Sequence, residues 1–190
     1  MKRDNHYERA FESFLRQRRI PYLAISEQRR NIAPDGTTVK TPDFLLSPPH
    51  RTPWIVDVKG RRFPGRGGAW KHWTTWDDFV GMRRWESVFG QGGEGLFVFA
   101  YQICGSTAPL PEERLFSYNK RLYAFVALRS RDYWPEARLL SPRWNTYSMP
   151  VGRFRALARP IEDFLTPLPP PAVSSFSRPS TVSGNPRYHF

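Results

Sequence analysis

Residues 42–59 read PDFLLSPPHRTPWIVDVK, and they carry the strongest indication of the fold in the chain. Two short apolar runs, over 41–46 and 54–59, are typical of strands because turn-forming residues bound each of them. The two prolines before His50 predict a turn between the runs. We therefore expect two neighbouring strands that can pair as a hairpin.

Charged side chains interrupt both runs at positions that a strand would place together. Side chains alternate along a strand, so Asp57 and Lys59 share one face while Val56 and Val58 point to the other. In a hairpin, Asp43 can lie beside Asp57. The pattern predicts that the two valines pack into the core and that the charged groups project together into a cleft.

An amphipathic helix is expected over about residues 5–19, before these strands. Its apolar stripe consists of Tyr7, Ala10, Phe11, Phe14 and Leu15. Asp4 or Asn5 can cap this helix, and Pro21 ends it. Glu8 lies about 90° from the centre of the stripe, at the border between core and water. A short strand over 22–25 should follow.

The remaining pattern completes an α/β layer fold. Thr75 and Asp78 form a capping box that starts a helix ending near Phe89. Two apolar runs, 96–101 and 122–128, are typical of strands buried on both faces. The loop between them contains Cys104, which we expect to be a small buried side chain. A short strand near 146–149 and helical turns over 153–165 are expected beyond.

The element order predicts an αβββαβ core with a mixed central sheet and an irregular C-terminal extension. We expect one domain over residues 1–165. Proline, serine and single aromatic residues dominate 166–190, which is typical of a disordered tail.

The amino-acid composition favours a protein that contacts nucleic acid. The chain has 190 residues and a net charge of +12, and its basic residues are mostly arginine. Arginine and abundant aromatic residues are typical of nucleic-acid surfaces, although a GC-rich genome would also favour arginine. One cysteine excludes an internal disulfide, and no zinc-site spacing is present. Without a signal peptide or an apolar run of membrane-spanning length, we expect a soluble cytoplasmic protein that contacts no membrane.

The segment 60–73 is rich in arginine, glycine and tryptophan, and we expect it to be a loop. Either it is a mobile surface loop or it grips nucleic acid, with basic groups on phosphate and Trp70 or Trp73 stacked on an unpaired base. The candidate contacts are Arg61, Arg62, Arg66, Trp70, Lys71, His72 and Trp73. The histidines are expected at the surface, and His72 is the one placed best to touch phosphate.

The acidic residues suit metal-dependent hydrolysis of phosphodiesters. Asp43 and Asp57 offer hard oxygen ligands to Mg²⁺ or Mn²⁺, and the Val58 carbonyl can add another. A bound ion lowers the pKa of its water and offsets charge on the phosphate. Lys59 can orient the nucleophile, and Glu8 can hold a metal-bound water or help to bind a second ion. Glu27 is an outside candidate for the same site.

Pro42-Asp43 followed by Asp57-Val58-Lys59 resembles the PD-(D/E)xK motif of the restriction-endonuclease-like fold. The order of elements also matches over about residues 5–101, and within that superfamily the layout is most similar to archaeal Holliday-junction resolvases. This resemblance implies that Asp43 and Asp57 are metal ligands, that Lys59 is catalytic, and that Glu8 belongs to the metal site.

The leading hypothesis is a Mg²⁺-dependent endonuclease that acts on DNA rather than RNA, with branched DNA among its candidate substrates. The alternatives are a non-catalytic nucleic-acid-binding module on the same fold and an arginine-rich RNA-binding protein. Each residue also has a purely structural explanation: Asp57 and Lys59 as an exposed pair, Asp43 as a turn residue, and Glu8 as a favourable helix charge. Cleavage of two strands would favour a symmetric homodimer.

Overall fold

The computed structural model describes residues 5–25, 31–32, 36, 38–49, 52–64 and 70–165. The expected tail over 166–190 lies outside the described residues, as do Arg66, Glu27 and His50. In the described part of the chain, no helix combines the length and apolar character needed to span a membrane.

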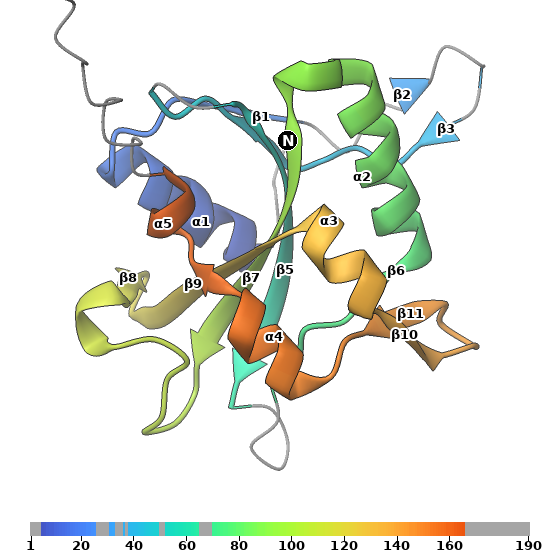
Figure 1. Ribbon diagram of the computed structural model, residues 1–190. Coiled ribbons are helices and arrows are strands. Elements are labelled where there is room, and N and C mark those ends of the chain that lie inside the picture. Colours follow the sequence, from blue (N-terminus) through green and yellow to red (C-terminus); the bar gives the residue numbers. More distant parts are fainter. Residues whose placement is uncertain are drawn as a thin grey trace, which may run out of the picture.

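A mixed sheet of seven strands forms the centre of the molecule (Figure 1). The strands along its main path are, in order, β1 (Tyr22–Ala24), β4 (Phe44–Leu46), β5 (Trp54–Phe63), β7 (Glu94–Ile103), β9 (Arg121–Arg129) and β12 (Arg159–Pro160), and β8 (Phe116–Tyr118) pairs with β9. Among the described strands, only β5 and β7 pair in parallel, because α2 (Trp76–Phe89) lies between them in the chain and supplies the crossover that parallel strands need.

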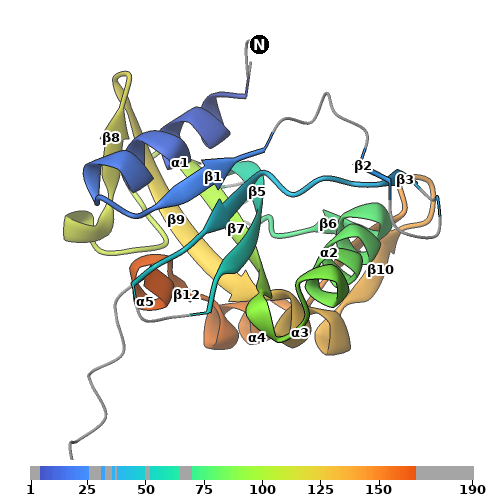
Figure 2. The same ribbon diagram turned by 90° about the horizontal axis from the view of Figure 1, so that it is seen from above.

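The helices divide between the two faces of the sheet (Figures 1 and 2). One face packs against α1 (His6–Gln17) and α5 (Glu162–Leu165). The opposite face packs against α2, α3 (Ser130–Tyr133) and α4 (Val151–Leu157). Each face therefore has its own apolar core, which explains why the central strands are apolar at nearly every position.

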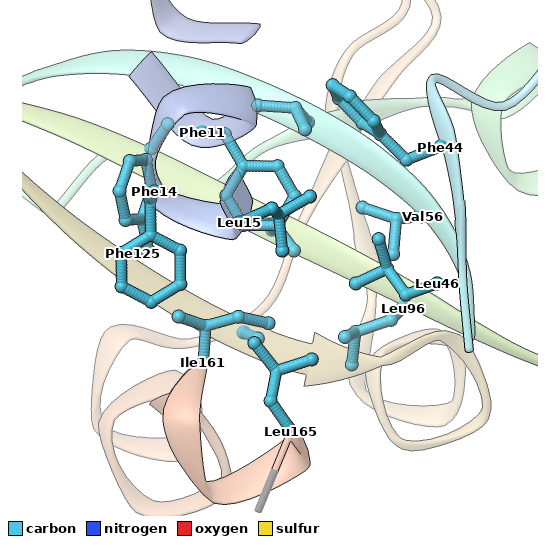
Figure 3. Packing of buried hydrophobic residues seen from close by; sticks show 14 of the residues in the cluster. Phe11, Phe14, Leu15, Phe44, Leu46, Val56, Leu96, Phe125, Ile161 and Leu165 are labelled. Carbon is cyan, nitrogen blue, oxygen red and sulfur yellow. The ribbon is translucent and has the colours of Figure 1, made fainter. Parts of the chain in front are cut away.

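The core under α1 has the composition expected from the helical stripe (Figure 3). Phe11 and Phe14 pack against Phe125 of β9, and Leu15 and Ile161 belong to the same buried cluster. The ring of Phe11 meets that of Phe125 at 5.2 Å between centroids. Burial of such side chains contributes about 1.5–3 kcal/mol each, so this cluster anchors α1 to the sheet.

Smaller elements extend the α2 side of the molecule. A three-stranded sheet has the order β10 (Arg138–Ser141), β11 (Thr146–Ser148) and β6 (Thr74–Thr75). The β10–β11 hairpin projects away from the central sheet (Figure 1). Other short elements lie elsewhere in the chain: β2 (Asn31–Ile32), β3 (Thr38–Val39) and the 3-10 turns η2 (Gly90–Gly92), η3 (Glu112–Arg114) and η4 (Trp134–Glu136).

Some expected boundaries were wrong. The strand expected to end at Lys59 continues to Phe63, because β7 pairs with β5 along its whole length, from Trp54 with Glu94 to Phe63 with Ile103. Cys104 is exposed rather than buried, since it follows the last residue of β7 and lies beyond the sheet. The expected Asn5 cap of α1 is confirmed: its side chain accepts a hydrogen bond from the backbone N–H of Tyr7.

Candidate active site

The β4–β5 hairpin holds Asp43 against the neighbouring strand through two hydrogen bonds. The backbone N–H of Asp43 donates to the Val56 carbonyl at 2.8 Å. Its Oδ2 accepts the backbone N–H of Val58 at 2.7 Å. The hairpin predicted from the sequence is thus present, with Phe44 opposite Val56, and it fixes the Asp43 carboxylate beside β5.

Asp57 and Lys59 share the face of β5 that packs toward α2. Val56 and Val58 belong to the core under α1, whereas Ile55 belongs to the core under α2. By alternation, Asp57 and Lys59 lie on the side of Ile55. The Lys59 Nζ lies 2.6 Å from Asp57 Oδ2, and both side chains are buried. The predicted common face is confirmed.

Glu8 approaches from the first turn of α1. Its side chain is buried, and its Oε1 accepts a hydrogen bond of 2.6 Å from the Asn5 side-chain amide. A glycine in β5 lets this turn come close, because a Cβ on Gly60 would collide with the ring of Tyr7. The absence of a side chain at position 60 therefore positions the N-terminal turn of α1 against the strand that carries Asp57 and Lys59.

The carboxyl groups act on one another electrostatically. Burial raises the pKa of Asp43 well above its usual value, and the negative charges of Asp57 and Glu8 raise it further. The hydrogen bond from Val58 and the charge of Lys59 oppose this shift only in part. The carboxyl groups of Asp57 and Glu8 therefore create a field at Asp43 that favours a proton or a cation.

Sequence reasoning missed Asp78 as a member of the site. Its Oδ2 lies 2.9 Å from Lys59 Nζ, and its other oxygen pairs with the Lys40 ammonium. The same carboxylate accepts hydrogen bonds from the Thr74 hydroxyl at 2.9 Å and the Thr75 backbone N–H at 2.8 Å. Asp78 thus completes the capping box of α2, whose N-cap is Thr75, and holds the amine of Lys59.

The surroundings of Asp78 strongly favour the negatively charged form of its carboxyl group. Burial by itself would raise the pKa of this carboxyl, but Lys59 and Lys40 lower it below its usual value overall. Burial likewise disfavours the charged form of Lys40, and Asp57 and Asp78 raise its pKa above the ordinary range. The Lys59 ammonium thus pairs with two carboxylates, those of Asp57 and Asp78.

The expected loop after Lys59 is partly strand. Arg61 extends from β5, donates to the carbonyls of Gly60 at 2.7 Å and Trp73 at 2.5 Å, and stacks on the Trp73 ring with 3.9 Å to its centroid. Arg62 is exposed at the end of β5, 3.3 Å from Cys104 Sγ. Lys71 is exposed. These three basic side chains and Trp73 lie at one end of β5.

Two expected nucleic-acid contacts are turned inward. His72 is only 2% exposed, so the expectation of a surface histidine that touches phosphate was wrong. Its Nδ1 lies 2.7 Å from the Trp70 carbonyl and its Nε2 lies 2.8 Å from the Met149 carbonyl. Trp70 packs edge-on against Phe63, at 5.3 Å between ring centroids. Core packing overrode the polar character of this segment.

The donor chemistry of the site fits a divalent cation. Asp43, Asp57 and Glu8 carry hard carboxylate oxygens, which are the donors that Mg²⁺ and Mn²⁺ prefer. Within the described residues, no three His, Cys, Asp or Glu side chains are grouped closely enough to hold a metal ion. Asp57 instead contacts Lys59, so cation binding requires these side chains to reorient.

Comparison with known proteins supports the fold. The structure is similar to that of Hjc from Archaeoglobus fulgidus, a Holliday junction resolvase, with a TM-score of 0.51 and 11% sequence identity, over 85% of this chain and 98% of that chain. Neither a protein-family model nor a curated protein matches the sequence. The likeness confirms the α/β, restriction-endonuclease-like fold class with its mixed central sheet.

Proposed function

We propose that this protein is a Mg²⁺- or Mn²⁺-dependent endonuclease that hydrolyses phosphodiester bonds in branched or structured DNA. One observation carries the proposal: the β4–β5 hairpin fixes the buried Asp43 carboxylate, whose Oδ2 lies 2.7 Å from the Val58 backbone nitrogen, beside the buried pair of Asp57 and Lys59. Buried carboxylates that lie close together cost free energy unless a cation neutralises part of their charge. The similarity to a Holliday junction resolvase supports a nuclease on this fold and motivates branched DNA as the substrate.

The residues would divide the work as follows. Asp43, Asp57 and Glu8 would hold the ion, with the Val58 carbonyl as a further ligand. When bound, the ion supplies Lewis-acid stabilisation of phosphate charge and an activated water. Lys59 would orient the nucleophile and offset negative charge on the phosphate, while Asp78, 2.9 Å from its amine, keeps Lys59 in place.

Charge supports a nucleic-acid substrate. The net charge is +12, and Arg62 and Lys71 present exposed basic groups near the end of the strand that carries Asp57. Such groups would neutralise phosphates and make binding salt-dependent. We further propose that the protein works in the cytoplasm on DNA rather than RNA, and that cleavage of two strands uses a homodimer.

A second candidate is a non-catalytic nucleic-acid-binding module on the same fold. The ion pair between Lys59 and Asp57 favours it, because the ammonium already neutralises one of the three carboxylates that would hold a metal. In this case the buried charges would only hold β5 and α2 together. Cleavage assays separate the two candidates.

The test uses labelled four-way-junction, duplex and single-stranded DNA with Mg²⁺, Mn²⁺ or chelator. Lys59→Gln is compared with Lys120→Gln, a matched change at an exposed lysine in the turn between β8 and β9. We expect metal-dependent cutting that falls about 10²- to 10³-fold in Lys59→Gln, since a charge-stabilising group in the site is lost. Lys120→Gln should cut like the wild type.

Circular dichroism and thermal denaturation establish that both variants fold. Cutting that survives in folded Lys59→Gln, or that persists in chelator, would rule out the proposed mechanism. Salt-dependent binding of all three DNAs without cutting would favour the non-catalytic module instead.

A further inference from the structure

The β10–β11 hairpin forms one wall of an apolar pocket of about 490 Å³. The lining residues are Trp73, Thr75, Leu140, Ser141, Trp144 and Thr146. Trp73 lies on the segment that leads into β6, and β6 pairs with β11. Two tryptophans from segments far apart in the sequence thus contribute to one pocket.

The hairpin leaves its large apolar side chains exposed. Trp144 is 68% exposed and Leu140 is 58% exposed. The turn between β10 and β11 presents Trp144, and the following residue, Asn145, has a positive φ of 46° that closes this turn. Exposed aromatic groups that line a hollow indicate a binding surface rather than a contribution to the core.

The charged side chains beside the pocket are arginines, which attract a polyanion. The Arg61 guanidinium lies 3.9 Å from the centroid of the Trp73 ring, and that of Arg143 lies 5.3 Å from that of Trp144. The hairpin, residues 138–148, contains two arginines and neither Asp nor Glu. Aromatic rings beside arginine suit a nucleotide, whose base stacks on an open ring face while its phosphate meets the exposed Arg143 guanidinium.

A chain of contacts connects this pocket to the candidate active site. Trp73 immediately precedes Thr74, whose hydroxyl donates to Asp78 at 2.9 Å. Asp78 in turn pairs with Lys59 at 2.9 Å. Arg61, which stacks on Trp73, is two residues beyond Lys59 in β5. Direct contacts therefore link the pocket to the acidic residues, so one nucleic-acid strand can reach both.

We propose that this pocket, lined by Trp73 and Trp144, binds an unpaired nucleobase of the nucleic-acid substrate. The inference rests on the proposed function for the nature of the substrate, and it adds what the protein selects: DNA with an extrahelical or unpaired nucleotide. A fully paired strand keeps its bases stacked on one another and cannot fill the pocket without the cost of unstacking.

The test measures affinity in chelator, so that no cutting occurs. One probe is a DNA duplex with a single unpaired 2-aminopurine, and the other is the same duplex fully paired. The wild type should prefer the first probe and quench its 2-aminopurine fluorescence. Trp144→Ala should weaken binding of the first probe alone, by roughly 5- to 150-fold, the range for loss of one base–aromatic stack.

Two further variants serve as controls. Trp144→Phe retains an aromatic face and should recover most of the preference. Val88→Ala, at an exposed apolar position on α2, should behave like the wild type. Trp144 is mostly exposed, so its replacement leaves the folded core intact.

An equal loss on both probes, or no loss with Trp144→Ala, would overturn the base pocket; the latter would fit a surface for a protein partner. Cutting that depends on Lys59 without any Trp144-dependent preference would refute the pocket and leave the nuclease proposal standing. Selective binding of the unpaired probe without cutting of DNA would support the pocket and refute the nuclease proposal.

Discussion

Replacement of Asp43 by asparagine should stabilise the protein in chelator and remove a specific pH dependence. Burial, Asp57 and Glu8 raise the pKa of Asp43 well above 3.8 in the folded state. The folded protein then keeps a proton that the unfolded chain has lost, so it binds more protons between 3.8 and the raised pKa. Stability must therefore fall as pH rises through this window.

The magnitude follows from linkage. One extra proton bound in the folded state gives a slope of about 1.4 kcal/mol per pH unit. For a protein of this size the slope corresponds to a fall in Tm of about 3–6 °C per pH unit. Asparagine has nearly the same shape and can still accept the backbone N–H of Val58, which lies 2.7 Å from Asp43 Oδ2, but it does not titrate.

The assay is thermal and urea denaturation of the wild type and Asp43→Asn from pH 4 upward in chelator. Subtraction of the two curves cancels the other titrating groups and leaves the Asp43 slope. Addition of Mg²⁺ at about 100 times its Kd should stabilise the wild type by about 2.7 kcal/mol and the variant much less. Parallel pH curves for the two proteins would refute the electrostatic reasoning.

Three other substitutions probe the surroundings of the site. Asp78→Asn removes the carboxylate that pairs with Lys59 and should cost roughly 3 kcal/mol in urea denaturation; a loss under about 1 kcal/mol would contradict the structure. Gly60→Ala drives a Cβ into the ring of Tyr7 and should cost about 1–3 kcal/mol, and Tyr7→Ala in the same chain should recover part of it. Burial lowers the pKa of His72, so the folded state binds fewer protons than the unfolded chain below pH 6.5 and stability rises with pH there, by up to about 1.4 kcal/mol per unit. His72→Gln should flatten this rise in denaturation curves, and an unchanged slope would show that His72 is not the group responsible.

Elements with local residue patterns could be predicted from the amino-acid sequence. The apolar stripe of α1 depends on helical spacing, and the shared face of Asp57 and Lys59 depends on the alternation of a strand. The turn between β4 and β5 follows from its prolines, and it is enough to bring Asp43 to β5. Each of these features involves residues close in the chain, where backbone geometry decides the outcome.

The other features depend on contacts between residues far apart in the chain, which local patterns do not reveal. The capping residue Asp78 is recognisable locally, yet its bond to Lys59 requires α2 to pack on the face of β5 that carries the lysine. His72 looked polar and exposed, yet it is buried, with its Nε2 2.8 Å from the carbonyl of Met149, 77 residues away, and its ring stacked on Phe154. Trp144 had no recognisable partner in the sequence until β11 paired with β6 and placed it in one pocket with Trp73.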